Sequence, residues 1–271
     1  MFRAGNFTLP LGKKTYVMGI LNYTPDSFSD GGLYNTPEKA VEHALLMQEQ
    51  GADIIDVGCN STRPGSKILT EEEELIRLKE VLPALQGKIS VPVSVDTFYP
   101  LCAEYALQNG AVIINDVSGT FNSEIASKVN EYGAGYIVTH NPCGASDTVS
   151  YPDGVATAVR NFFMECISKA AQCGLKKENL CLDPGFGFGK TEKDNYELLD
   201  NLHWTKFEDY ALLAAISRKR FINKCDFSLI DYATSAADTL AIEGGADIIR
   251  VHNVAAAVAS AKVADAIYRK V

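Results

Sequence analysis

The apolar run Tyr16-Val17-Met18-Gly19-Ile20 leads directly into Leu21-Asn22-Tyr23-Thr24-Pro25-Asp26-Ser27-Phe28-Ser29-Asp30-Gly31-Gly32. The first run has the length and composition of a buried strand, and Pro25 and Gly31-Gly32 mark the polar segment after it as irregular. Taken alone, this pattern is typical of any connection between a strand and a helix. It decides the fold because the rest of the chain repeats it.

The order of apolar strand, polar loop and helix recurs along the chain. Further strands are expected at residues 52–57, 91–95, 112–114, 135–139, 180–182, 210–216 and 247–251. Helices are expected at residues 37–50, 100–109, 123–132, 155–173, 196–202, 228–244 and 254–270, with another starting after Thr70 and a short strand pair within residues 1–14. Eight strand-then-helix units with apolar strands predict a parallel sheet closed into a barrel. We therefore expect an α/β fold, a single-domain (β/α)8 TIM barrel over residues 1–271 with a short N-terminal strand pair.

An open, doubly wound sheet is the alternative architecture. Such a sheet usually carries G-x-G-x-x-G after its first strand, where this chain has Asn22-Tyr23-Thr24-Pro25. The Gly-rich residues 183–191 do not form a phosphate-binding P-loop either, because Pro184 stands where the first glycine is required. The glycines of that segment are instead expected to let the backbone pass close to a flat ligand.

Composition excludes several classes of partner. A net charge of −9 and a pI near 5.0 argue against a nucleic-acid surface, which needs clustered Lys and Arg. There is no run of 18 apolar residues and no apolar core of a signal peptide near Met1, so no membrane partner and a cytoplasmic location are expected. The seven cysteines are widely spaced without a C-x-x-C pair, which favours reduced thiols over disulfides or a zinc site.

Polar side chains gather at the expected strand ends. In such barrels the active site is built at the C-terminal ends of the strands. Any one of these residues could cap a helix or be solvated, but a fold has no structural need to bring so many together. The residues at this position are Asn22, Thr62, Arg63, Asp96, Asn115, Asp183, Lys219, Arg250 and His252.

Alternation along the last strand sharpens the hypothesis. If Val251 faces the helices, Arg250 and His252 share the inner side of the barrel. The Cys and His residues do not have the spacing of a metal cage. A hard cation held by Asn22 and by oxygens of the ligand is the more plausible metal site.

Seven motifs in this order resemble the dihydropteroate synthase family, and the resemblance covers nearly the whole chain. They are Met18-Gly19-Ile20-Leu21-Asn22 with Thr24 to Gly32, Ser61-Thr62-Arg63-Pro64-Gly65, Val95-Asp96-Thr97, Asn115-Asp116-Val117-Ser118-Gly119, Asp183-Pro184-Gly185 with Gly187-Phe188-Gly189-Lys190-Thr191, Ser217-Arg218-Lys219, and Arg250-Val251-His252. The resemblance implies a (β/α)8 barrel that condenses 6-hydroxymethyl-7,8-dihydropterin diphosphate with 4-aminobenzoate, giving 7,8-dihydropteroate and diphosphate. It also implies Mg2+ and a homodimer that forms through the later helices.

The resemblance implies roles for individual residues. Asp183 would accept paired donors from the pterin, Asp96 and Asn115 would hold other ring atoms, and Arg250 would lie flat against the ring. Catalytic roles are implied for Arg63, His252, Asp30 and Lys219, and a metal-binding role for Asn22. Contacts to aminobenzoate are implied for Thr62, Pro64, Phe188 and Arg220. The loops around Asp26 to Asp30 and Thr62 to Ser66 would close when diphosphate and metal are bound.

Some positions depart from the family pattern. Cys59-Asn60 replaces Gly-Glu, Asn253 replaces Asp, and Ala215-Ile216 stands where a glycine precedes Ser-Arg-Lys. The methionine that the family commonly places near residues 139–140 is absent. Two other functions stay open, a pterin-binding methyltransferase barrel and a non-catalytic pterin-binding paralogue.

The change Arg63→Ala should slow turnover by about 10²-fold or more, because it removes the cation that, as the resemblance implies, stabilises the departing diphosphate. Steady-state assays with pterin diphosphate and 4-aminobenzoate measure this effect. A rate close to that of the unchanged protein would contradict the assignment.

Overall fold

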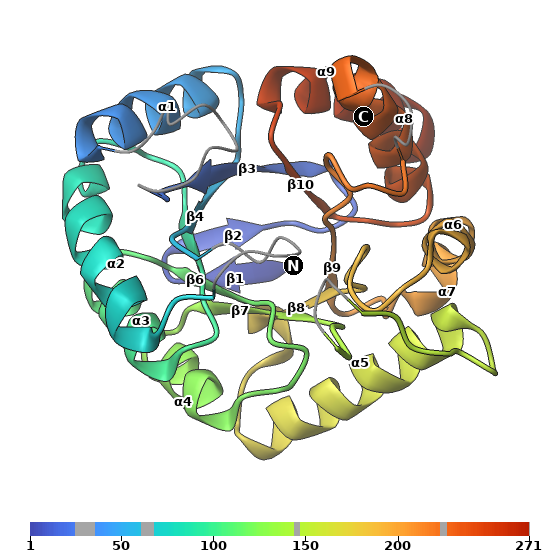
Figure 1. The fold of residues 1–271 in the computed structure, drawn as a ribbon, viewed down its shortest axis with the longest axis horizontal. Coiled ribbons are helices and arrows are strands. Elements are labelled where there is room, and N and C mark those ends of the chain that lie inside the picture. Colours follow the sequence, from blue (N-terminus) through green and yellow to red (C-terminus); the bar gives the residue numbers. More distant parts are fainter. Residues whose placement is uncertain (25–35, 61–67, 144–146, 223–226, 271) are drawn as a thin grey trace.

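The computed structural model describes residues 1–24, 36–60, 68–143, 147–222 and 227–270. Its centre is a closed barrel of eight parallel strands in the order β10-β3-β4-β5-β6-β7-β8-β9, ringed by helices (Figure 1). The (β/α)8 barrel is confirmed, and the doubly wound alternative is wrong. The barrel strands are β3 (Tyr16–Asn22), β4 (Ile54–Gly58), β5 (Val93–Asp96), β6 (Ile113–Asp116), β7 (Gly135–Thr139), β8 (Leu180–Asp183), β9 (Ala211–Ala214) and β10 (Ile248–Val251).

The helices follow the strands in the expected order. The α-helices are α1 (Pro37–Glu49), α2 (Glu71–Leu85), α3 (Pro100–Gln108), α4 (Ser123–Glu131), α5 (Val155–Gln172), α6 (Glu192–Asp200), α7 (Leu202–Thr205), α8 (Ile230–Glu243) and α9 (Val254–Tyr268), and short 3-10 turns lie at Lys177–Asn179 and Phe227–Leu229. The predicted helix at 196–202 in fact begins at Glu192. Thr191 and Asp194 form a capping box there, in which each side chain accepts from the other backbone N–H, at 3.2 and 2.8 Å.

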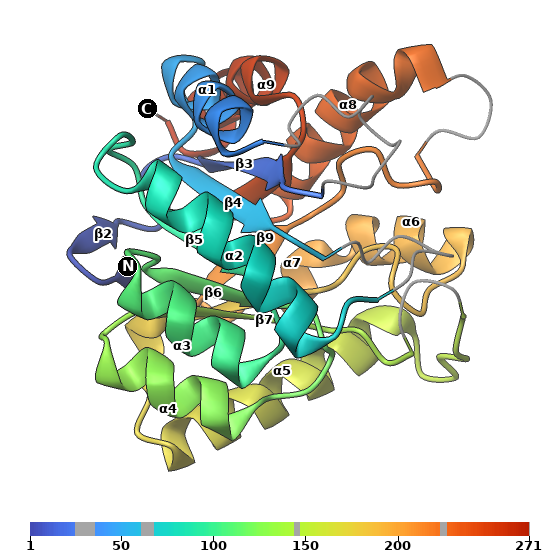
Figure 2. The ribbon, with the colours of Figure 1, turned by 60° about the vertical axis from the view of Figure 1, so that its left-hand side comes forward.

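The predicted N-terminal strand pair is present as β1 (Phe2–Ala4) and β2 (Phe7–Leu9), which pair antiparallel. Phe2 and Leu9 are buried in the apolar cluster inside the barrel, together with Tyr16 and Ile248 from the starts of β3 and β10. Figure 2 shows this pair at the end from which the arrows of β3 and β4 start. The hairpin therefore covers the amino-terminal end of the barrel and leaves the opposite end, here called the barrel mouth, to the loops.

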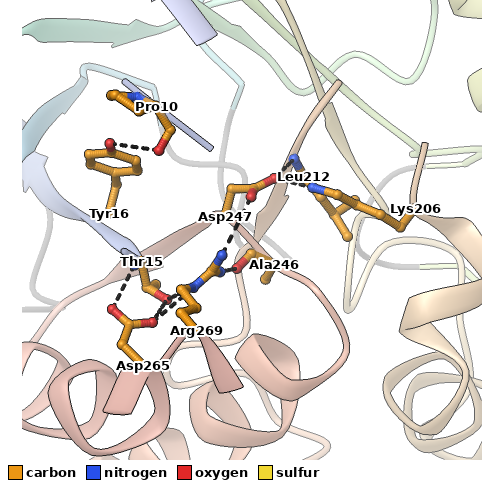
Figure 3. Close-up of polar contacts among 9 residues, drawn as sticks. All are labelled: Pro10, Thr15, Tyr16, Lys206, Leu212, Ala246, Asp247, Asp265 and Arg269. Carbon is orange, nitrogen blue, oxygen red and sulfur yellow. Dashed lines mark hydrogen bonds and ion pairs between the residues drawn. The ribbon is translucent and has the colours of Figure 1, made fainter. Parts of the chain in front are cut away.

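A buried polar network joins the last helix to the start of the first barrel strand (Figure 3). Asp265 accepts hydrogen bonds from the backbone N–H and the hydroxyl of Thr15, both at 2.7 Å. Arg269 donates to Asp265 at 2.9 Å and to the carbonyl of Ala246 at 2.6 Å, and its other terminal nitrogen lies 3.9 Å from Asp247. The C-terminal turn thus holds the start of β3 beside the start of β10.

Asp247 continues the same network to the neighbouring strand. Its carboxylate accepts from the backbone N–H of Leu212 in β9 at 3.0 Å and pairs with Lys206 (Figure 3). Its backbone carbonyl accepts from the backbone N–H of Tyr16 at 2.8 Å. Asp247 is almost fully buried. A buried carboxylate is stable only when it is hydrogen-bonded. These bonds therefore favour the observed register of β10 against β3 and β9, where the barrel closes.

Two further expectations concern the chain as a whole. Six of the seven cysteines are free thiols, which fits the expected reduced state, and Cys225 lies outside the described residues. Across the described ranges, no helix has both the length and the apolar character needed to cross a membrane.

Asp238 is a buried acid on α8 whose two carboxyl oxygens lack a hydrogen-bond partner within the described ranges. Burial raises its pKa to about 8. An unfolded aspartate titrates near pH 4, so between about pH 4 and pH 8 the unfolded chain loses a proton that the folded chain keeps. Stability should therefore fall as pH rises through this window.

The change Asp238→Ala should raise Tm by about 3 °C or more at pH 8, and by less at pH 5, because it removes this unpaired acid. Thermal unfolding followed by circular dichroism at both pH values tests the expectation. Thr239→Ala, on the next residue of the same helix, is the control and should shift Tm equally at both. Equal gains for Asp238→Ala at the two pH values would contradict it.

Candidate active site

The ends of four barrel strands place polar side chains at the barrel mouth. Asn22 ends β3, Asp96 ends β5 and Asp183 ends β8, while Asn115 lies beside Asp96 in the register between β5 and β6. These side chains lie at the same end of the barrel because all its parallel strands end on that side. The predicted gathering of polar residues at one rim is confirmed for these positions.

Arg250 on β10 lies between two carboxylates on other strands. Its Nε donates to Asp56 at 2.6 Å, and a terminal nitrogen donates to Asp96 at 2.9 Å. Asn115 also donates to Asp56, at 3.1 Å. Burial raises the pKa of Asp96 to about 7, with Asp56 adding to the shift and Arg250 opposing it. Arg250 stabilises this pair of carboxylates, because a charge that is buried without a partner of opposite sign destabilises the folded protein.

Asp183 faces the mouth from the opposite part of the barrel. Its carboxylate accepts from the backbone N–H of Gly185 at 2.7 Å and lies 3.4 Å from the hydroxyl of Thr139. Burial raises its pKa, and the contact with Gly185 opposes that shift. The buried hydroxyl of Thr139 therefore points at the Asp183 carboxylate.

Lys219 follows β9 and reaches across the Gly-rich loop. Its Nζ donates to the carbonyl of Phe186 at 2.7 Å and lies 4.3 Å from the centroid of the Phe188 ring. Burial lowers its pKa to about 8, while nearby Asp183 opposes the shift. The mouth therefore holds a cation, an aromatic face and a carboxylate close together.

Lys190 connects two loops at the mouth, the loop after β7 that begins at His140 and the loop after β8 that contains Gly185 and Phe188. Its buried ammonium donates to the carbonyls of Gly185 and Phe188 at 2.8 and 3.0 Å, and approaches His140 at its carbonyl, 3.3 Å, and its ring Nδ1, 3.0 Å. Burial lowers the pKa of His140 to about 3, and the charge of Lys190 adds to this. The imidazole is thus neutral and accepts through Nδ1.

The glycines of this loop are required by close contacts within the protein. Gly185 and Gly187 have φ values of +67° and +80°. A Cβ on Gly185 would lie 2.0 Å from the carbonyl of His140, and one on Gly187 would lie 2.9 Å from Cδ of Lys219. We expected these glycines to accommodate a ligand, whereas among the described residues the atoms that crowd them belong to His140 and Lys219.

His252 is held by the loop after β9. Its ring Nδ1 lies 3.0 Å from the hydroxyl of Ser217, which also accepts from the backbone N–H of His252 at 3.2 Å. Val251 packs in the apolar layer between barrel and helices, so the predicted alternation around it is confirmed. Asn253 caps α9 by accepting from Ala256 at 3.1 Å, as its amide allows.

The remaining predicted residues divide into three groups. Phe188 is buried beside Lys219, and Arg220 is exposed on the loop that follows Lys219. Asp26, Asp30, Thr62, Arg63, Pro64 and Ser66, with the two closing loops that contain them, lie outside the described residues.

Asp56, Thr139 and Lys190 contact groups of the site and were not predicted from the sequence. Asp56 had a signal in the sequence, since a carboxylate between Ile54 and Gly58 in an otherwise apolar strand shares their side of the sheet.

The carboxyl ends of the barrel strands thus carry buried acids, an amide and cations at one mouth, which is the arrangement of a (β/α)8-barrel enzyme site for a polar ligand. The sequence model of the family described as "Pterin binding enzyme" matches residues 18–252. The chain is 42% identical to the dihydropteroate synthase of Synechocystis sp., over 95% of this chain and 92% of that protein. It is 40% identical to that of Bacillus subtilis, over 95% and 90%.

Solved structures of dihydropteroate synthases are similar to this chain in both fold and sequence. A dihydropteroate synthase from Clostridium difficile, crystallised with pteroic acid, has a TM-score of 0.89 at 41% identity and covers 97% of this chain and 100% of that one. The Xanthomonas albilineans enzyme with 4-aminobenzoic acid has a TM-score of 0.86 at 39% identity, with 94% of each chain covered. The chain belongs to the pterin-binding enzymes, and within them to the dihydropteroate synthase family.

Lys190→Met should lower the free energy of unfolding by about 3 kcal/mol, since it leaves buried carbonyls of two loops without a donor. Denaturant unfolding measures the loss. Lys193→Met, on the exposed face of α6, is the matched control and should change stability by less than about 0.5 kcal/mol. Similar losses in both variants would show that the buried contacts of Lys190 contribute little.

Proposed function

We propose that this chain is a dihydropteroate synthase, a transferase that joins 6-hydroxymethyl-7,8-dihydropterin diphosphate to 4-aminobenzoate and releases 7,8-dihydropteroate and diphosphate. The observation that carries the proposal is the set of polar groups at the mouth, on a chain about 40% identical to such enzymes over most of its length. Asn115 and Asp183 are buried, and Asp96 and Lys219 are partly buried. We propose that the 271 residues act as a single pterin-binding domain.

The pterin ring matches the groups at the mouth. Its guanidine-like edge presents two neighbouring donors, which the carboxylate of Asp183 can accept as a pair. Asp96 and Asn115 can take other ring atoms, and Lys219 can donate to ring acceptors. Arg250, fixed by Asp56 and Asp96, presents a planar guanidinium on which a flat ring can stack.

The leaving diphosphate is the largest charge in the reaction. An arylamine is a weak nucleophile, so the step depends on stabilising the departing group as the bond to the pterin methylene breaks. His252, oriented by Ser217, can donate to diphosphate oxygens, and Arg63 is proposed to do the same. We propose that Asp30 is catalytic together with Arg63, His252 and Lys219. Neither Arg63 nor Asp30 lies within the described residues.

Mg2+ fits at Asn22 when diphosphate is present. The half-buried amide at the end of β3 offers one oxygen, and its Oδ1 lies near the Gly58 backbone, where a Cβ would be 3.6 Å away. Within the described ranges, no group of three or more His, Cys, Asp or Glu could hold a metal. Since Mg2+ takes few protein ligands when phosphate oxygens and water complete its shell, we propose Asn22 as the protein ligand of the ion. When bound, the ion would neutralise charge on the diphosphate.

Aminobenzoate is proposed to bind beside Phe188. The ring of Phe188 offers an apolar face next to Lys219, and exposed Arg220 on the following turn can meet the carboxylate. Thr62 and Pro64, which lie outside the described residues, are proposed to complete this pocket.

An assay of product formation tests the function. The purified protein should form dihydropteroate from pterin diphosphate and 4-aminobenzoate with Mg2+, and excess EDTA should remove most of the activity. Calorimetry should show binding of the pterin substrate, Mg2+ and aminobenzoate. Binding of the pterin without any turnover would overturn the synthase and favour a pterin-binding methyltransferase or a non-catalytic paralogue.

Lys219 should set an alkaline limit to activity. Because its pKa is lowered to about 8, it is a cation below that pH and loses its proton above it. We therefore expect kcat/KM for the pterin substrate to fall above about pH 8. Lys219→Arg should move the midpoint of this decline up by about one pH unit or more, whatever its rate, since arginine keeps its charge. Lys193→Arg is the control, and an unmoved midpoint in Lys219→Arg would contradict the expectation.

We propose that the protein is a cytoplasmic homodimer. Free cysteines stay reduced in the cytoplasm. The packed helices α8 and α9 expose large apolar side chains, as a dimer interface would. Sedimentation should give the mass of two chains, and Ile267→Glu should shift it toward one, whereas Ile76→Glu on distant α2 should not. The exposed apolar residues of these helices and of the turn before α8 are Leu229, Tyr232, Leu240, Val263, Ile267 and Tyr268.

A further inference from the structure

Asp56 is a fully buried carboxylate in the middle of β4. It lies below the rim, where it has no place among the groups assigned to substrate, metal or leaving group. Yet it contacts two of those groups from other strands, Asn115 on β6 and Arg250 on β10. Its neighbours therefore connect it to the ligand site, although it lies behind that site.

One oxygen of Asp56 makes both contacts. Its Oδ2 accepts from Nε of Arg250 at 2.6 Å and from Nδ2 of Asn115 at 3.1 Å. A carboxylate accepts and does not donate, so the Asn115 amide must turn its NH2 group toward Asp56. If the amide were flipped, its oxygen would face the carboxylate oxygen, and the two would repel each other.

This orientation leaves a defined acceptor on Asn115. Its Oδ1 is buried and has no hydrogen-bond partner in the part of the chain that the structure describes. A buried carbonyl oxygen without a partner is costly, and a donor from a bound ligand would remove that cost. The same carboxylate holds Arg250 by Nε, which fixes the plane of the guanidinium while Asp96 holds its other side.

We propose that Asp56 is a positioning residue that sets the polarity of the pterin site, by directing the Asn115 amide oxygen toward a ring N–H and by fixing the plane of Arg250. The inference rests on the proposed function. It adds a selection rule, because a heterocycle with an N–H at that position is paired, whereas an isostere with a ring acceptor there would face the oxygen of Asn115. Sites with buried polar groups reject such ligands strongly.

A double-mutant cycle tests the proposal. The proteins are wild type, Asp56→Ala, Asn115→Ala and the double variant, each titrated with pterin diphosphate and Mg2+ by calorimetry. Asp56→Ala should weaken binding about tenfold in the wild-type background and by a smaller factor when Asn115 is already alanine, because only the contribution through Arg250 then remains and coupled residues are not additive. KM for the pterin substrate should rise in Asp56→Ala, while KM for aminobenzoate should stay unchanged.

Asp56→Asn is the conservative variant, because its amide oxygen can still accept both bonds. It should lose less pterin affinity than Asp56→Ala, and it keeps the test valid if Asp56→Ala does not fold. Equal weakening by Asp56→Ala in both backgrounds, or an equal rise in both KM values, would overturn the positioning role while leaving the synthase intact. Failure of the wild-type protein to bind pterin diphosphate would overturn the proposed function, and this inference with it.

Discussion

The guanidinium of Arg250 is the charge on which the arrangement of the barrel mouth depends. Asp56 and Asp96 are brought close together on neighbouring strands, and without a cation between them their repulsion would oppose folding. Arg250 comes from β10, at the other end of the chain from β4 and β5. The pairing becomes possible when the last strand closes against the first, so closure of the sheet and assembly of the site are one event.

The other half of the mouth depends on loops. Asp183, Lys219 and the Phe186 to Phe188 turn are held by backbone contacts. Lys190 joins the loop after β8, which carries Phe186 to Phe188, to the loop after β7. The two sides of the mouth are therefore held differently. On the strand side Arg250 pairs with two carboxylates, and on the loop side Lys190 holds the backbone of the loop after β8. The strand side can hold a flat ring in a fixed plane, while the loop side can adapt to a second ligand beside it.

The fold was readable from the sequence because its signals are local. Apolar runs give the strands, and capping residues such as Thr70 with Glu73 give the starts of helices. Strand ends likewise predicted Asn22, Asp96 and Asp183, since barrel geometry places every strand end at one rim. Asp56 lies in the middle of β4, so the rule that strand ends carry the site did not predict it. Its inward position nevertheless follows from the alternation of side chains along a strand.

Other features could not be predicted from local patterns. Three of the four partners of Lys190 are backbone carbonyls, which every residue has, so the sequence does not mark them. Arg250 and Asp56 are 194 residues apart, and only the closed sheet brings them together. The crowding at Gly185 comes from the carbonyl of His140 in another loop, so the reason for that glycine appears only in three dimensions.

The network of Thr15, Asp247, Asp265 and Arg269 has a consequence for synthesis of the chain. Arg269 is made after all eight barrel strands, yet it holds the start of β3 beside the start of β10. While the ribosome still retains the turn at Arg269, the seam lacks these bonds and the sheet keeps two open edges. A nascent chain therefore has to keep those edges from pairing with other chains until Arg269 has emerged.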